Sequence, residues 1–153
     1  SGGSSAGNYD YTSKVISLLD DGEVFVHGIS IKPGKPTIIG RSKDKLIFGL
    51  PGHPISSMVV FNIIVKKLIE SLYLQEDKDD FYYGILSQNV HSTPGRTTYQ
   101  MINKTVENNE IIINPIFGKS GMTTLMTKSN GYIILESDME GLEKTSRVKV
   151  YKF

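Results

Sequence analysis

The sequence contains no cysteine, which excludes disulfide bonds, thiolate metal sites and cysteine nucleophiles together. Neither sign of charge is in excess, because 17 lysines and arginines stand against 16 aspartates and glutamates. This balance gives the chain no general attraction to nucleic acid, to an anionic membrane or to a basic partner. A site for an anionic ligand must therefore be built from local groups.

Long apolar runs are missing as well. The most apolar stretch, residues 58–74, is interrupted by Lys66, Lys67 and Glu70, whereas a helix that spans a bilayer needs about 20 apolar residues. Residues 1–5 read SGGSS and have neither the basic nor the apolar region of a signal peptide. We therefore expect a soluble, cytoplasmic protein.

The first half of the chain mixes helix and strand patterns. A loop of small residues at 1–7 leads into a predicted helix that ends near Gly22. The apolar residues of this helix fall on one side: Val15, Ile16, Leu18 and Leu19. Three strands and a long apolar helix are predicted to follow, over residues 23–31, 37–40, 45–50 and 54–74. A glycine loop before a helix is a layout that binds phosphate, although a flexible Gly/Ser linker has the same composition.

Residues 75–80, QEDKDD, have no apolar side chain and are the best candidate for a linker. Beyond them the pattern changes to short strands, predicted over residues 81–90, 97–106, 110–117, 131–136 and 147–151, with one helical segment at 122–129. Several short strands in one small domain are typical of a barrel or a sandwich. We predict an α/β domain over residues 1–75, followed by a small all-β barrel domain over residues 80–153.

Two loops of the first half are candidates for binding an anion. IKPGKP at 31–36 places Lys32 and Lys35 on a turn stiffened by prolines, where an anion meets fixed donors. GLPGHPIS at 49–56 lies at the carboxyl end of a strand and at the start of a helix, where α/β sheets bind ligands. The alternatives are a surface turn with two solvated lysines and a plain connection between strand and helix.

Asp10 and the histidines are further candidates. The carboxylate of Asp10 follows the glycine loop, where it caps the helix or holds Mg²⁺ against the oxygens of a phosphate. His53 has no identifiable serine or aspartate partner, which favours a loop residue or a cap over a catalyst. His27 and His91 lack the spacing of metal ligands, so no metal site built from histidines is predicted.

Three segments together carry a family resemblance: SGGSSAGNYD at 1–10, IKPGKP at 31–36 and GLPGHPIS at 49–56. Their order and spacing are similar to the loops that line the pterin site in the MoeA/gephyrin E-domain family, the molybdopterin molybdenumtransferases. TPGR at 93–96 and KSG at 119–121 resemble motifs of that family's C-terminal β domain. The resemblance implies a C-terminal part of such a protein, with a partial MogA-like molybdopterin-binding domain followed by the family's domain IV.

The resemblance also implies roles for single residues. Backbone N–H groups of the first loop would hold phosphate, at Gly2, Gly3, Ser4, Ser5 and Gly7. Asp10 would contact the metal ion or the nucleotide part of the ligand. Lys32 and Lys35 would bind the anionic ligand or molybdate. The pocket wall would include Pro51, Gly52 and Pro54. Arg96 and Ser120 would reach toward the pocket from the β domain of the same or a partner subunit. His53 stands where the family usually has asparagine, which leaves one side-chain contact open.

The activity implied by the resemblance is the insertion of molybdenum from molybdate into adenylylated molybdopterin, with Mg²⁺ as cofactor and release of AMP. The family acts as a homodimer on these small molecules, without nucleic acid or membrane. Its members have further domains upstream, so we expect this chain alone to be inactive. The alternatives are a molybdopterin adenylyltransferase, against which the β domain argues, and a scaffold that binds peptides as the gephyrin E domain does.

We expect limited proteolysis to cut first within residues 75–80, because exposed polar linkers are preferred sites of cleavage. Trypsin can act there at Lys78, and a glutamate-specific protease at Glu76. Mass spectrometry of the first fragments identifies the cut. Residues 58–74 provide the comparison, because Lys66 and Lys67 offer trypsin the same chemistry; earlier cutting there would contradict the boundary.

Overall fold

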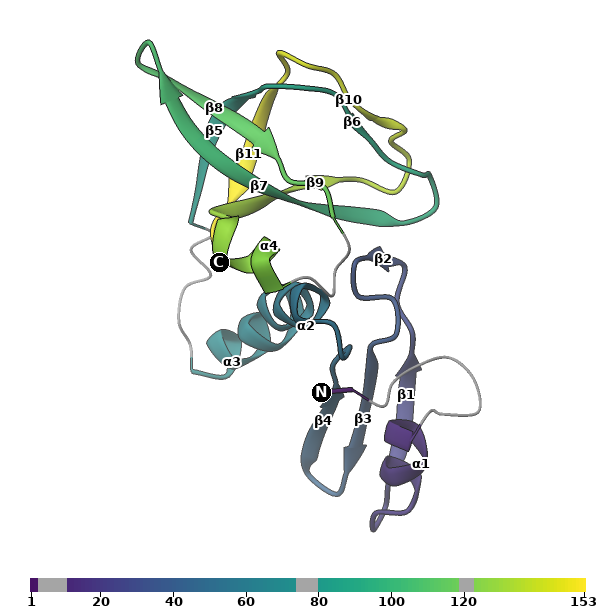
Figure 1. Ribbon diagram of the computed structural model, residues 1–153. Coiled ribbons are helices and arrows are strands. Elements are labelled where there is room, and N and C mark those ends of the chain that lie inside the picture. Colours follow the sequence, from purple (N-terminus) through teal and green to yellow (C-terminus); the bar gives the residue numbers. More distant parts are fainter. Residues whose placement is uncertain (3–10, 74–79, 119–122) are drawn as a thin grey trace. The chain divides into compact units, whose positions relative to one another are not determined.

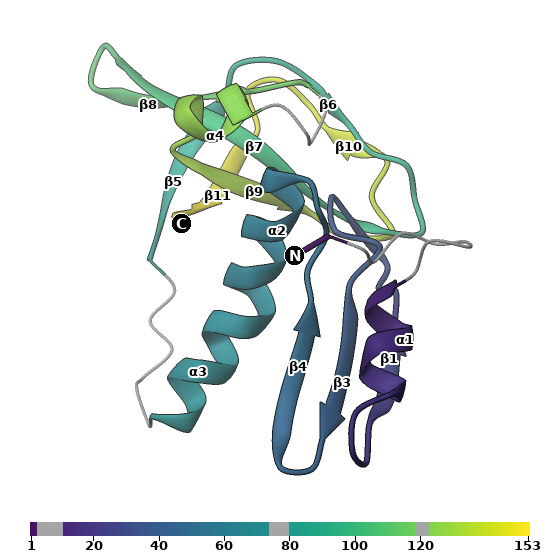
Figure 2. The same cartoon turned by 60° about the horizontal axis from the view of Figure 1, so that its bottom comes forward.

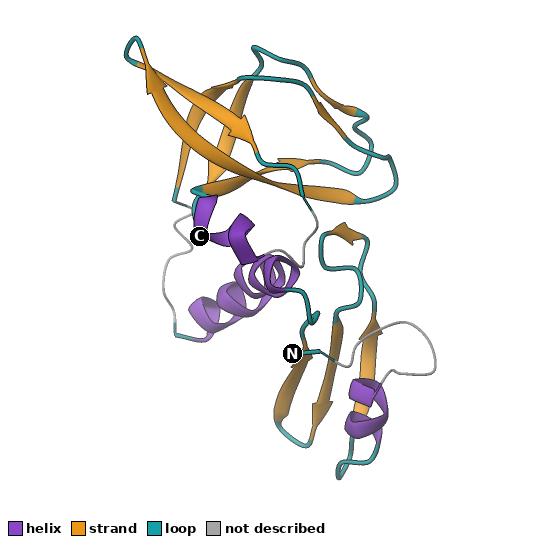
Figure 3. Cartoon of the chain, in the orientation of Figure 1, coloured by secondary structure: helices purple, strands orange, loops and turns teal. Residues whose placement is uncertain are grey.

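The computed structural model of the 153-residue chain describes residues 1–2, 11–73, 80–118 and 123–153 (Figure 1). The chain forms two compact units, Ser1–Gln75 and Glu76–Phe153. The first combines helices with a small sheet, and the second consists mainly of strands (Figure 3). The expected fold class, an α/β part followed by a small barrel, is confirmed. No helix in the described part of the chain is long and apolar enough to cross a membrane.

The sheet of the first unit has three antiparallel strands in the order β1-β3-β4. They are β1 (Glu23–His27), β3 (Ile38–Ser42) and β4 (Lys45–Gly49), which lie side by side in Figure 2. The prediction of a strand over 23–31 is too long. The chain leaves β1 after His27, because Gly28 has a φ of +89°, which is not an extended conformation. The Gly28 amide still donates to the Thr37 carbonyl at 2.8 Å, and the residues between them form a loop. The short β2 (Ile31–Lys32) lies within that loop.

Helix α1 (Tyr11–Ser17) packs on this sheet through Ile16, whose side chain is 1% exposed. The prediction that four apolar residues share one side of the helix is wrong for three of them. The helix ends at Ser17, so Leu18 and Leu19 belong to the turn after it. Val15 is on the helix but remains 56% exposed. A single isoleucine therefore provides the buried face of α1.

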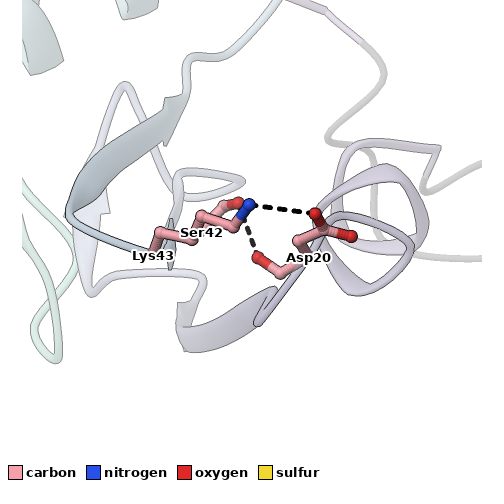
Figure 4. A network of polar contacts seen from close by, with 3 residues as sticks. All are labelled: Asp20, Ser42 and Lys43. Atoms are coloured by element: carbon pink, nitrogen blue, oxygen red, sulfur yellow. Dashed lines mark hydrogen bonds and ion pairs between the residues drawn. The ribbon is translucent and has the colours of Figure 1, made fainter.

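The turn after α1 is tied to the hairpin between β3 and β4 through Asp20 (Figure 4). The Ser42 hydroxyl donates to the Asp20 carbonyl at 2.8 Å, and Lys43 Nζ lies 3.0 Å from the Asp20 carboxylate. Exposed ion pairs contribute about 0–1 kcal/mol to stability. The contact therefore serves mainly to fix the path of the chain between helix and sheet.

Residues 54–72 form one continuous helix, in agreement with the prediction of a long helix from Pro54. Its parts are α2 (Pro54–Val60), the π-helix η1 (Phe61–Lys66) and α3 (Lys67–Leu72). Pro54 fits the first turn because its missing N–H has no partner there. Only α2 has buried residues, which are Ile55, Ser56, Val59 and Val60. Helix α2 is therefore the part that positions the loops around it.

The second unit is a closed barrel of five strands in the order β7-β8-β5-β11-β9, with β9 paired back to β7. The strands are β5 (Phe81–Leu86), β7 (Thr97–Glu107), β8 (Glu110–Pro115), β9 (Gly131–Leu135) and β11 (Arg147–Tyr151). Only β5 and β8 pair in parallel. A two-stranded ladder, β6 (Val90–His91) with β10 (Gly141–Leu142), and the helix α4 (Thr123–Lys128) complete the unit.

The five predicted strands of this unit are all present. The strand over 147–151 has the predicted bounds, and the other four have shorter or shifted ends. The strand predicted over 81–90 divides into β5 and β6, since the chain leaves the ladder after Leu86. Aliphatic side chains fill the barrel: Leu86, Val90, Ile102, Ile113, Ile133, Leu135, Val148 and Val150. Alternate residues of β5 and β11 point into this core, so the other residues of both strands form the outer surface.

We expect Gly131→Ala to destabilise the barrel by about 1–3 kcal/mol, the usual cost of overpacking. A Cβ on Gly131 would overlap the backbone carbonyl oxygen of Tyr151, where β9 meets β11. The measurement is hydrogen exchange at Ile133, which reports on the barrel alone. Glu136→Ala, at an exposed position directly after β9, is the control and should leave the exchange unchanged. Equal exchange in both variants would show that the barrel has room at this position.

Candidate functional site

The start of the glycine-rich loop lies against the GLPGHP loop. The Gly2 amide donates to the Leu50 carbonyl at 3.0 Å, and the Thr12 hydroxyl donates to the Gly2 carbonyl at 3.2 Å. A Cβ added at Gly52 would lie 3.4 Å from the Gly2 Cα. Two of the three motif segments, distant in sequence, are thus brought together at the first turn of α1.

Gly49 allows this close packing at the end of β4. The residue is buried, and a Cβ there would lie 2.6 Å from Thr12 Cγ2. Any side chain would therefore push α1 away from the end of the strand. The loop after β4 lies at the strand's carboxyl end and leads directly into helix α2, as the sequence predicted. The sheet is antiparallel, so the role of this loop in binding a ligand stays a prediction.

The loop continues into helix α2 through His53 and Pro54. Pro51 is buried, whereas Gly52 and His53 are exposed. His53 is the N-cap residue, with extended backbone angles, and its carbonyl accepts the Ser57 amide at 2.9 Å. Its side chain does not cap the helix. The interpretation of His53 as a loop residue therefore agrees with its geometry better than the interpretation as a side-chain cap.

The IKPGKP turn is held rigidly by hydrogen bonds on its inner side. The buried Thr37 hydroxyl donates to the Gly34 carbonyl at 2.7 Å, and the Ile29 amide donates to the Lys35 carbonyl at 3.0 Å. The peptide between Lys32 and Pro33 is cis. Because these bonds use the inner backbone groups, the outer side chains are left to solvent or to a ligand.

Gly34 packs this turn against helix α2. Its φ of +124° is a conformation that side chains rarely adopt, and a Cβ would lie 2.8 Å from Val60 Cγ2 and 2.6 Å from Ile31 Cδ1. Val60 lies six residues after Pro54, so the turn packs on α2 about 9 Å along the helix axis from the residue at which the GLPGHP loop enters the helix. One helix therefore supports both motif segments.

Lys32 and Lys35 are exposed, and within the described residues neither forms an ion pair. Other lysines of the first unit differ, because Lys43 and Lys66 lie within 4 Å of carboxylates. Two cations without a carboxylate on a rigid turn are suited to bind an anion, since little conformational freedom of the backbone is lost on binding.

The remaining candidates divide between two groups. Gly3, Ser4, Ser5, Gly7, Asp10 and Ser120 lie outside the described residues. Arg96 is exposed in the turn of the second unit before β7, where the neighbouring Gly95 amide donates to the Ser137 carbonyl at 2.7 Å. In the described ranges no group of three or more histidines, aspartates and glutamates could hold a metal ion.

Three residues that position the loops could not be recognised as such from the sequence: Thr12, Thr37 and Val60. Each is outside the glycine and proline motifs, and their roles depend on partners far along the chain or on the folded turn. The one sequence signal for the role of Thr37 is its position directly after the second proline of KPGKP. Threonine hydroxyls in turns often form hydrogen bonds with nearby backbone groups.

Comparison with protein families gives two matches, one for each unit. Residues 1–71 match the probable molybdopterin binding domain, and residues 83–153 match the MoeA C-terminal region (domain IV). The chain is 33% identical over 150 residues to the putative molybdopterin biosynthesis protein MJ0666 of Methanocaldococcus jannaschii, covering 98% of this chain and 34% of the relative. It is 32% identical over 160 residues to the molybdopterin molybdenumtransferase of Haemophilus influenzae, covering 100% and 38%.

Solved structures agree with these matches. Two structures of the molybdopterin biosynthesis MoeA protein from Pyrococcus horikoshii superpose on the chain with TM-scores of 0.76 and 0.80, at 27% and 34% identity. Each superposition covers 94% of this chain and 34% of the solved chain. The chain thus spans about a third of the length of its relatives.

We expect Thr37→Val to destabilise the first unit by about 1–3 kcal/mol, because the buried Gly34 carbonyl loses its donor. The amide of Ile29 should also exchange faster with solvent, as the turn loosens. Thr37→Ser keeps the hydroxyl and should behave much like the wild type. The measurements are denaturant unfolding and amide hydrogen exchange. Equal stability of the valine and serine variants would show that this hydrogen bond does not hold the turn.

Proposed function

Because the chain belongs to the MoeA family, we propose that the protein acts in molybdenum cofactor biosynthesis as a molybdopterin molybdenumtransferase. In this proposal the complete protein inserts molybdenum from molybdate into adenylylated molybdopterin and releases AMP. The matches of both units to molybdopterin-binding and MoeA C-terminal domains support it. So do the names of the relatives, which include molybdopterin molybdenumtransferases.

The observation that carries the proposal is the junction of the motif loops around α2. Gly2 lies against Leu50 and Gly52 at one end of this helix, and the turn with Lys32 and Lys35 packs on Val60. A phosphorylated pterin, its adenylate and molybdate are all anions. The chain's net charge of +1 provides no general attraction, so backbone N–H groups and locally placed ammonium groups must bind them.

The chemistry proposed for this site needs no side-chain nucleophile. Water attacks the adenylate phosphorus and the bond from this phosphorus to the pterin phosphate oxygen breaks. The pterin phosphate is the leaving group, and AMP forms with the oxygen of the water. Fixed donors of the glycine loop and the ammonium groups of Lys32 and Lys35 stabilise the negative charge that develops on the phosphate oxygens. Asp10 would hold Mg²⁺, and the ion would withdraw charge from those oxygens.

Further parts of the proposal concern the pocket wall and the assembly. Pro51, Gly52 and Pro54 would shape one wall, since their loop begins beside Gly2. Arg96 and Ser120 would contribute polar groups from the second unit. A cytoplasmic homodimer is proposed for the complete protein. The second unit argues against a single-domain adenylyltransferase, because it matches the MoeA C-terminal region over residues 83–153.

In the complete protein, Lys32→Ala or Lys35→Ala should weaken binding of adenylylated molybdopterin or molybdate by about 1.5–3 kcal/mol, the usual value of a hydrogen bond to a charged group. Stability should hardly change, since both lysines are exposed. Calorimetric titration of each ligand, together with a thermal melt, provides the measurement.

Lys43→Ala is the matched control for this experiment. It removes the same charge from an exposed position of the same unit, where Lys43 is paired with Asp20, and should leave both affinities unchanged. If the Lys32 and Lys35 variants bind both ligands as the control does, the turn is only a surface turn. A large fall in their melting temperature would instead make the lysines structural.

A further inference from the structure

The outer face of strands β5 and β11 alternates aromatic rings with cations. In the antiparallel register Lys149 is opposite Tyr83, and Tyr151 is opposite Phe81. The inward residues of the same strands are Gly84, Leu86, Val148 and Val150, which are buried. We name the outward set the aromatic-cation face: Phe81, Tyr83, Arg147, Lys149 and Tyr151.

The side chains of this face contact one another closely. Lys149 Nζ lies 4.0 Å from the centroid of the Phe81 ring and 4.6 Å from that of Tyr151. The Arg147 guanidinium lies 4.7 Å from the Tyr83 ring, and the Phe81 and Tyr83 rings meet edge to face at 5.8 Å. Each cation is thus supported by at least one ring, which limits the rotamer freedom that binding would remove.

The face carries two positive charges and no negative charge. Neither β5, with the sequence FYYGIL, nor β11, with RVKVY, contains an acidic residue. Within the described residues no carboxylate forms an ion pair with Arg147 or Lys149. The neighbouring Lys152 differs, because its Nζ lies 2.8 Å from the Asp80 carboxylate. Arg147 and Lys149 therefore keep donors for an external acceptor.

Two rings of the face are exposed to solvent. The side chains of Phe81 and Tyr83 are 44% and 46% exposed. A guanidinium that lies over a ring keeps N–H groups in its own plane, where a carboxylate can accept two hydrogen bonds. The combination of exposed rings with such donors fits a ligand that has both carboxylates and apolar side chains.

The strand pairing limits how such a ligand can bind. β5 is paired on both sides, with β8 and β11, and β11 is paired with β5 and β9. The barrel therefore offers no free edge at these strands, and a partner cannot bind there by adding a strand. Recognition must use the side chains of the outer face.

We propose that the aromatic-cation face is a docking surface for an acidic segment of another protein. Carboxylates of the segment bind Arg147 and Lys149, and an apolar side chain of the segment packs on Phe81 and Tyr83. Charge complementarity favours this partner. Single-stranded nucleic acid is less suited, because two cations neutralise few phosphates and the chain as a whole has a net charge of only +1.

The test uses the 153-residue chain and a fluorescein-labelled peptide of alternating glutamate and phenylalanine. Fluorescence anisotropy measures its affinity, and NMR shift changes identify the surface that it contacts. We expect binding, with the largest shifts in β5 and β11. The same peptide with glutamine in place of glutamate should bind about five- to tenfold more weakly, because the charge-assisted hydrogen bonds are lost.

Variants then test the two cations. Arg147→Gln and Lys149→Gln should each weaken binding of the acidic peptide by about fivefold or more. Lys144→Gln, an equal charge change at an exposed position of the same unit, should have less than about a twofold effect. Arg147→Lys keeps the charge but loses the planar fork, and should give an intermediate affinity. Thermal melts confirm that each variant is folded.

Several outcomes would overturn the proposal. These are an absence of binding, equal affinity for the glutamate and glutamine peptides, or shifts that map outside β5 and β11. Equal weakening by the Lys144 variant would show a general charge effect. Tighter binding of labelled oligothymidine than of the acidic peptide would assign the face to nucleic acid. None of these measurements depends on pterin or molybdate, so they are independent of the proposed enzymatic function.

Discussion

The packing of the IKPGKP turn on helix α2 is the contact on which the arrangement of the first unit's loops depends. Gly34 has no side chain, so the turn can lie close to Val60 of the helix, and within the turn the Thr37 hydroxyl donates to the Gly34 carbonyl at 2.7 Å. The same helix begins in the GLPGHP loop, against which Gly2 is hydrogen-bonded through Leu50. Loops far apart in sequence thus share one rigid support, and a ligand that contacts both meets donors already in place.

The two units use different means to position functional groups. In the first, small residues permit close approach of backbone segments, and the binding groups are amides and two lysines on loops. In the second, complete pairing of five strands holds side chains at fixed spacings on the barrel surface, so Arg147 and Lys149 stand beside aromatic rings. The first arrangement suits small anions, and the second presents a broader surface suited to a peptide.

Much of this architecture could be predicted from the sequence because its signals are local. The apolar run after Pro54, the glycine and proline turns and the alternation in the second half indicate helix, loops and strands from neighbouring residues alone. The early end of β1 could not be predicted in this way, because the alternating pattern continues to Ile31 although Gly28 takes a φ of +89° in the folded chain. The order of the strands in the barrel could not be predicted either, since the pairing of β7 with β9 joins segments about 30 residues apart. The prediction of the buried side of α1 was wrong because the apolar pattern continues through Leu18 and Leu19, whereas the helix ends at Ser17.

The two ends of the barrel meet at one point. The Lys152 amide donates to the Asp80 carbonyl at 3.0 Å, and the side chains of the same residues form an ion pair. The chain therefore enters the barrel at Asp80 and leaves it at Lys152, beside Asp80. The barrel could be joined to another protein through these two residues without a break in any strand. Adjacent ends of this kind permit insertion of a domain into another protein or circular permutation. The barrel can accordingly be transferred to another protein as a whole, and the aromatic-cation face on β5 and β11 would be transferred with it.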